Sequence, residues 1–164
     1  MTTIESLRNL QDRLHEPLSV HERVRLLNRI AEELYEREPA RGVTMARESV
    51  GLARATADTP GEAQALYCLG RNLFSIADYP AVFETQNDAL ALFRGMNDSE
   101  GEAKCLNLLR FCGDEWNKTA PPDQRVIEME IQQRQWDFIA DGDDPTRFRV
   151  ADRATVGFGE QSSR

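Results

Sequence analysis

The chain lacks several features that would point to particular protein classes. Its apolar runs are far shorter than the roughly 18 residues that a membrane-spanning helix requires. The N-terminal segment shows no basic stretch followed by an apolar one, so it does not resemble a secretion signal. The three cysteines form no CxxC pair, which fits buried thiols in a reducing compartment. We therefore expect a protein of the cytoplasm that makes no membrane contact.

Positive charge is also scarce, and it is concentrated nowhere along the chain. The formal net charge is −8, and the only lysines are Lys104 and Lys118. Nucleic-acid phosphates would be repelled by such a chain unless it carried a strong local basic patch. We expect no nucleic-acid partner, and the acidic balance by itself identifies no other partner.

Motifs that carry catalysis or bind metals are missing as well. The sequence contains no glycine-rich phosphate loop and no nucleophile elbow. The histidines, His15 and His21, do not stand at metal-site spacing from the cysteines. An acidic run at 141–152 departs from a calcium-binding loop at Pro145 and Thr146. We expect no enzymatic activity, no metal and no cofactor.

The chain contains a helix-start motif that occurs three times at equal spacing. Each copy pairs a hydroxyl residue with a glutamate three positions later: Ser19 with Glu22, Thr59 with Glu62, and Ser99 with Glu102. The hydroxyl can accept a backbone N–H, and the glutamate can accept the N–H of the first residue, which together make a capping box. The spacing predicts three helices that begin at these residues.

Apolar residues at helical spacing follow each signal. They are Leu27, Ile30, Ala31 and Leu34, then Leu66, Leu69, Gly70 and Leu73, then Leu106, Leu109 and Gly113. A second helix is predicted after each first one, with Pro39, Pro80 or Pro121 near its start. No alternating strand pattern occurs before residue 145. The sequence predicts an all-α fold of three helical hairpins, at 19–58, 59–98 and 99–140.

The middle hairpin resembles a tetratricopeptide repeat. Leu69-Gly70, Leu73 and Ala89 match the repeat pattern, Val82 and Gln86 fit it less closely, and the third unit departs from it at Arg110. The resemblance covers 19–140 and implies a right-handed array of three hairpins. The spacing exceeds the roughly 34 residues that are usual for these repeats. It is similar to the variety found in bacterial regulators, often beside nucleotide-cyclase or other signalling domains.

Both ends of such an array need a cover, because a single hairpin cannot bury its apolar stripe. Residues 1–18 are predicted to form an N-terminal capping helix, and 141–164 are a tail. In the expected last helix, Ile127, Ile131 and Phe138 form a second apolar stripe. We expect a homodimer through this stripe. The alternatives are a further repeat, cover by the tail, and a partly exposed terminal helix.

The resemblance implies that the first helix of each hairpin lines a concave groove that binds ligands. The residues expected there are Arg25, Asn28, Tyr35, Gln64, Tyr67, Arg71, Phe74, Lys104, Asn107 and Phe111. Amides would pair with a peptide backbone and rings would cover its apolar side chains. The alternative is that the rings fill the packing between repeats while the cations pair with acids. Of the lysine–asparagine clamp that some family members use for a terminal carboxylate, only Lys104 has a match.

Function is predicted from this groove. The first hypothesis is a non-catalytic protein–protein interaction module that serves as a docking or sensory domain of a bacterial signalling system. Its partner would be a peptide or helix held in the groove. A secretion chaperone that holds export substrates is the alternative, and a small-ligand sensor with a pocket at the third repeat is the third hypothesis.

Overall fold

The protein is built from α-helices throughout residues 3–119, the part that its computed structural model describes. The helices are α1 Thr3–Arg13, α2 Val20–Leu34, α3 Pro39–Ala55, α4 Thr59–Ser75, α5 Tyr79–Gly95 and α6 Ser99–Thr119. The predicted all-α class is confirmed for these residues. The second helix of the third hairpin, the self-association residues Ile127, Ile131 and Phe138, and the tail lie outside the described residues.

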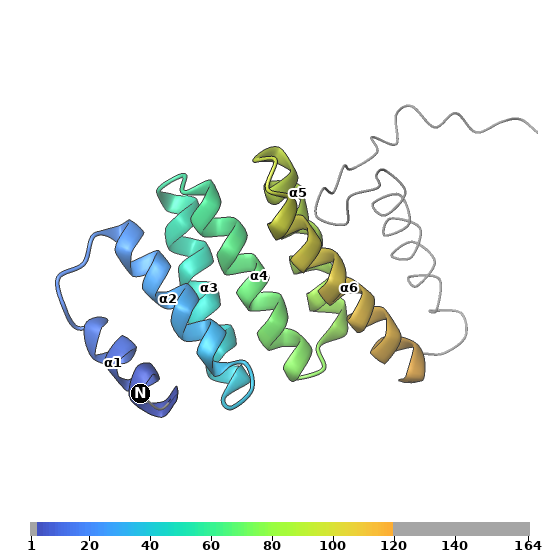
Figure 1. The fold of residues 1–164 in the computed structure, drawn as a ribbon, viewed down its shortest axis with the longest axis horizontal. Helices are drawn as coiled ribbons and strands as arrows, with labels where there is room; N and C mark the ends of the chain where they lie inside the picture. The colour runs from blue at the N-terminus through green and yellow to red at the C-terminus, as the bar shows by residue number, and fades with distance from the viewer. Residues whose placement is uncertain (1–2, 120–164) are drawn as a thin grey trace, which may run out of the picture.

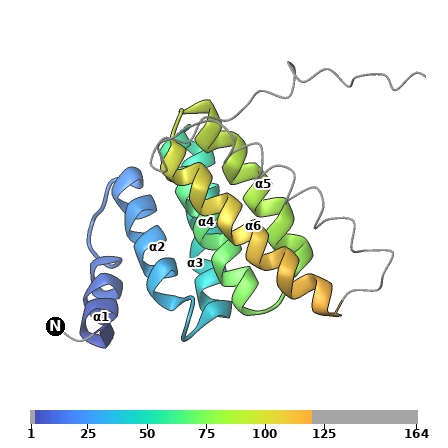
Figure 2. The ribbon, with the colours of Figure 1, turned by 45° about the vertical axis from the view of Figure 1, so that its right-hand side comes forward.

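The helices form two layers that alternate along the chain. Figure 1 shows α2, α4 and α6 side by side in front, with α3 and α5 behind them. Figure 2 shows the same succession after a turn of 45° about the vertical axis. Each back helix packs against the front helices that precede and follow it, and α2 contacts α4 as α4 contacts α6. The front helices therefore share one face, on which side chains from three separate segments meet.

The first of the three predicted capping boxes is confirmed. The Glu22 N–H donates to Ser19 Oγ at 3.3 Å, and the Ser19 N–H donates to Glu22 Oε2 at 2.9 Å. These two bonds satisfy backbone donors that the first turn of α2 would otherwise leave without a partner.

The other two predicted capping boxes are wrong by one residue. The cap of α4 is Asp58, which accepts from the Gly61 N–H at 3.0 Å, and Asp98 accepts from the Gly101 N–H at 3.0 Å ahead of α6. Thr59 and Ser99 are instead the first helical residues. His21 bonds Asp58 at 2.9 Å, and this bond together with the Gly61 N–H holds the pKa of Asp58 below its usual range.

The glutamates of those two signals join neighbouring helices rather than closing a cap. Glu62 pairs with Arg54 of α3 at 2.6 Å, and Glu102 pairs with Arg94 of α5 at 3.2 Å. Burial raises the pKa of Glu102, and its hydrogen bond from Arg94 opposes that rise. Each pair spans the turn between a back helix and the front helix that follows it.

The turns from α3 onward share one geometry. The φ angle is 54° at Ala57, 60° at Ala77 and 56° at Asn97, all in the left-handed region. In each turn, the backbone N–H of the residue after the left-handed one donates to a carbonyl oxygen in the last turns of the preceding helix. These bonds are Asp58 N–H to Ala53 O at 2.9 Å, Asp78 N–H to Leu73 O at 3.0 Å, and Asp98 N–H to Phe93 O at 2.9 Å. This is the Schellman motif. The aspartate after the left-handed residue thus ends one helix, and Asp58 and Asp98 also cap the next.

The core lies between the two layers and follows the predicted stripes. All of the apolar residues predicted for the first helices of the hairpins are buried. At the N-terminal end, Leu10 of α1 packs against Leu26, Ile30 and Leu34 of α2. α1 therefore covers the outer side of α2. No helix within residues 3–119 has the length and apolar content needed to cross a bilayer.

Two glycines of the core are required by amide side chains that occupy the space beside them. A Cβ on Gly42 would lie 1.8 Å from Asn72 Oδ1, and a Cβ on Gly70 would lie 1.9 Å from Gln86 Nε2. Asn72 donates to Ala31 O at 2.9 Å and to Cys68 O at 2.8 Å, and Gln86 donates to Leu66 O at 3.2 Å. These buried amides tie α4 to α2 and α5 to α4.

Candidate functional site

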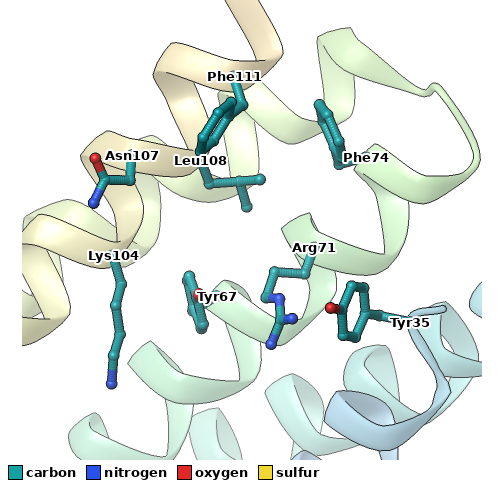
Figure 3. A pocket seen from close by; sticks show the side chains of 8 residues that line it. All are labelled: Tyr35, Tyr67, Arg71, Phe74, Lys104, Asn107, Leu108 and Phe111. Carbon is teal, nitrogen blue, oxygen red and sulfur yellow. The ribbon is translucent and has the colours of Figure 1, made fainter.

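A pocket of about 440 Å³ opens on the shared face of α2, α4 and α6. Eight residues line it: Tyr35, Tyr67, Arg71, Phe74, Lys104, Asn107, Leu108 and Phe111. All except Leu108 belong to the set expected in the groove. Figure 3 shows Phe74, Leu108 and Phe111 toward one end of the pocket, and Lys104 and Arg71 on either side of Tyr67 toward the other.

Helix geometry brings these side chains together. Tyr67, Arg71 and Phe74 follow one another at intervals of four and three along α4, so they lie on one side of that helix. α6 presents Lys104, Asn107, Leu108 and Phe111 in the same way, and Tyr35 directly follows α2. The pocket is therefore made by residues distant in the sequence, and it exists only when the three front helices are packed.

Arg71 is held mainly by aromatic rings. Its guanidinium carbon lies 3.8 Å from the centroid of the Tyr35 ring and 5.9 Å from that of Tyr67. Glu32 accepts a hydrogen bond from Arg71 Nη1 at 3.4 Å. The Tyr35 hydroxyl donates to Glu36, and this bond raises the pKa of Tyr35. The cation is thus fixed in place beside the pocket rather than extended into solvent.

The second cation of the pocket is Lys104. Its Nζ pairs with Glu100 one turn earlier on α6 at 2.6 Å, and both side chains are exposed. Burial raises the pKa of Tyr67, whereas the positive charges of Arg71 and Lys104 act to lower it. Both cations therefore lie close enough to Tyr67 to influence its phenol group.

The apolar end of the pocket is built on aromatic contacts. The Phe74 ring meets that of Tyr79 edge-on at 5.9 Å between centroids, and Tyr79 meets Trp116 in the same way at 6.0 Å. Phe111 remains 50% exposed, with the Arg110 guanidinium 4.2 Å from its ring centroid. Phe74 is anchored in the packing between helices, while Phe111 presents a large exposed apolar surface at the pocket.

Asn28 does not face the groove, contrary to the prediction. It is only 5% exposed: its Nδ2 donates to Gly61 O at 3.2 Å, and its Oδ1 accepts from Ser49 Oγ at 2.7 Å. The start of α4 covers this position of α2. Asn107 has the same position in α6, where no later front helix lies among the described residues, and it is exposed.

Two more predicted groove residues lie outside the pocket. Arg25 is exposed on α2, where its charge helps to lower the pKa of Glu22 and of Asp58. Gln64 is half-buried on α4 and donates to Cys68 Sγ at 3.5 Å. These two side chains serve local contacts near the N-terminal ends of their helices.

The lining is aromatic, apolar and cationic in character. It contains rings, two cations and an amide, but no carboxylate, histidine or thiol. The cysteines Cys68, Cys105 and Cys112 are buried, and burial raises the pKa of each thiol to about 12. Within residues 3–119, no group of histidine, cysteine and acidic side chains is arranged to hold a metal ion.

Comparisons with known proteins assign no family to this arrangement. No protein-family model matches the chain, and no curated protein matches it.

Proposed function

We propose that this protein is a non-catalytic protein–protein interaction module. In this proposal α1 caps a right-handed array of tetratricopeptide-like hairpins, and a peptide or helix of the partner binds on the face of α2, α4 and α6. The proposed setting is the cytoplasm of a bacterium, where the module would dock or sense a component of a signalling system. The observation that carries the proposal is the pocket, in which seven of the ten expected groove residues meet.

The repeat interpretation is supported by features that recur along the chain. The turns at Ala57, Ala77 and Asn97 have the same backbone geometry, and Asp58 and Asp98 accept equivalent hydrogen bonds ahead of α4 and α6. Repeated units of this kind stack on their neighbours and produce extended surfaces for partners.

Peptide binding is supported by the kind of side chains in the pocket. Tyrosine and phenylalanine rings supply large contact areas and lose little conformational freedom on binding. The Asn107 side chain lines the pocket and makes no hydrogen bond to another residue within 3–119, and its amide has the donors and the acceptor that pair with a peptide backbone. A half-exposed Phe111 beside it would become buried when a ligand binds.

The test is to select ligands from a displayed library of random short peptides and to measure their affinity by fluorescence anisotropy. Phe111→Ala should weaken binding of the selected peptides by about tenfold or more, because the ring forms one wall of the pocket. Ile76→Ala is the matched control, since Ile76 is 45% exposed in the turn after α4, away from the lining. Recovery of no specific peptide, or equal binding by the two variants, would rule the proposal out.

A small-ligand sensor is the second candidate, and the size of the pocket favours it. A volume of about 440 Å³ falls within the range of small-molecule sites, which are roughly 300–1,000 Å³ and rich in aromatic side chains. A melting-temperature screen with small metabolites tests this candidate. A shift that Phe111→Ala abolishes would favour it over peptide binding.

A further inference from the structure

The charge of the pocket differs from that of the chain as a whole. The protein carries a net charge of −8, yet the lining contains Arg71 and Lys104 and no acidic residue. The two lining cations attract anionic groups to the pocket, in competition with the flanking carboxylates of Glu32 and Glu100 that pair with them. The contrast supplies charge complementarity toward one class of ligand.

Arg71 retains hydrogen-bond donors that a ligand can use. An arginine has five N–H donors in a planar fork, and the Arg71 guanidinium bonds Glu32 and also interacts with the Tyr35 hydroxyl, which leaves further donors for a ligand. Glu32 is half exposed and lies 3.4 Å away, which is the geometry of a weak surface pair. Because stacking on Tyr35 keeps the guanidinium in position, a carboxylate can bind it without ordering the side chain first.

Lys104 can also bind a ligand carboxylate, because its ion pair within the protein is weak. Its partner Glu100 has a side chain that is 78% exposed, so this pair is also weak. Figure 3 shows Lys104 and Arg71 extending on opposite sides of the Tyr67 ring. A carboxylate above this ring would meet a cation on each side.

The other end of the pocket selects a different group. Phe74, Leu108 and Phe111 present carbon surface there, and Figure 3 shows them toward the end of the pocket opposite the two cations. A ligand that fills the whole pocket must therefore carry negative charge at one end and an apolar group at the other.

We infer that the pocket recognises a peptide segment in which an acidic side chain stands close to a leucine or aromatic side chain. The carboxylate binds between Arg71 and Lys104, and the apolar side chain packs on Phe74, Leu108 and Phe111. This inference rests on the proposed function, since it names the class of peptide that the interaction module takes.

The peptides selected from the random library test this inference through their sequences. Acidic residues next to leucine or aromatic residues should be enriched. Replacing the acid of a selected peptide by its amide should weaken binding by about tenfold, as expected for a lost hydrogen bond between charged groups. Affinity should also fall as salt concentration rises.

Variants of the protein test it independently. Lys104→Gln and Arg71→Gln should each weaken binding of the acidic peptide more than binding of its amide, by about tenfold for Arg71, so that each variant discriminates less between the two peptides than the wild type does. Arg47→Gln is the control, because Arg47 is an exposed cation on α3 in the back layer. Circular dichroism checks that the variants are folded, and the exposed Lys104 provides a readout that does not depend on Arg71.

The outcomes separate this inference from the proposed function. Selected peptides without acidic enrichment, with equal affinity for the wild type and both charge variants, overturn the inference. If Phe111→Ala still lowers the affinity for those peptides, the proposed interaction module is retained and its ligands belong to a different class. Peptides that bind Phe111→Ala as well as they bind the wild type overturn both.

Discussion

Two successive junctions of the front layer, α2 with α4 and α4 with α6, are built from equivalent helix positions but differ in how closely they pack. At the first junction, Asn72 of α4 donates to Ala31 O of α2 at 2.9 Å, and Asn28 of α2 donates to Gly61 O of α4 at 3.2 Å. Short amides bond the backbone of the opposite helix in both directions. The junction is closed, and its polar groups are buried.

The second junction lacks these amides. Cys112 stands where Asn72 stands in α4, and its thiol reaches Tyr79 O of α5 at 3.8 Å rather than the backbone of α4. Tyr67 occupies the position in α4 that Asn28 occupies in α2, and its ring is larger than the amide group of Asn28. The second junction opens into the pocket between α4 and α6. The two junctions therefore differ at these two positions, and the pocket lies at the one that lacks the amides.

The largest expected effect comes from pushing the closed junction apart. Gly42→Ala places a Cβ 1.8 Å from Asn72 Oδ1, and the two hydrogen bonds of Asn72 leave it little freedom to move. We expect a loss of about 2–3 kcal/mol in the free energy of unfolding, measured by urea denaturation.

Gly51→Ala is the matched control for that substitution in the same helix. Nothing lies within 4 Å of a Cβ at Gly51, so alanine should stabilise α3 by about 0.5–1 kcal/mol. Equal effects of the two substitutions would show that the contact between α2, α3 and α4 is looser than the structure describes.

A smaller effect should distinguish two asparagines that occupy the same helix position. Asn28→Ala removes the bonds to Gly61 and Ser49 and leaves their buried partners unsatisfied, so it should cost about 1–3 kcal/mol. Asn107→Ala on exposed α6 surface should change the free energy of unfolding by less than about 0.5 kcal/mol. Thermal melts of both variants check this, and similar losses would remove the contrast between the junctions.

The contrast also explains how far the pocket could be predicted from the sequence. Helical periodicity gives the direction of a side chain, and it identified Tyr67, Arg71 and Phe74 on one side of α4. Periodicity does not say which neighbouring helix covers that side. Periodicity therefore misassigns Asn28 to the groove, and it does not identify Leu108 as a lining residue.

The helix starts could be predicted only to within one residue, for a local reason. Aspartate, threonine and serine are all good caps, and the sequence has Asp58-Thr59 and Asp98-Ser99 side by side. The preceding turn decides between them. The left-handed residue of that turn directs the N–H of the aspartate toward the C-terminal end of the preceding helix. The aspartate side chain then caps the helix that follows. Spacing between the signals pointed to the wrong residues, since Ser19, Thr59 and Ser99 are equally spaced whereas the caps Ser19, Asp58 and Asp98 are not.

The smallest expected effect tests whether the turns contribute to the difference between the junctions. Ala57 precedes α4, Ala77 follows it, and both have the left-handed backbone that disfavours alanine. Ala57→Gly and Ala77→Gly should therefore each raise the free energy of unfolding by about 0.5–1 kcal/mol in urea denaturation.

The control is Ala91→Gly, at an exposed position inside α5, which should lower the free energy of unfolding by about 1 kcal/mol. Equal gains at Ala57 and Ala77 mean that the turns are energetically alike, so the side chains alone make one junction closed and the other open. A gain at Ala57 without one at Ala77 would instead place part of the difference in the backbone that leads from α4 to α5.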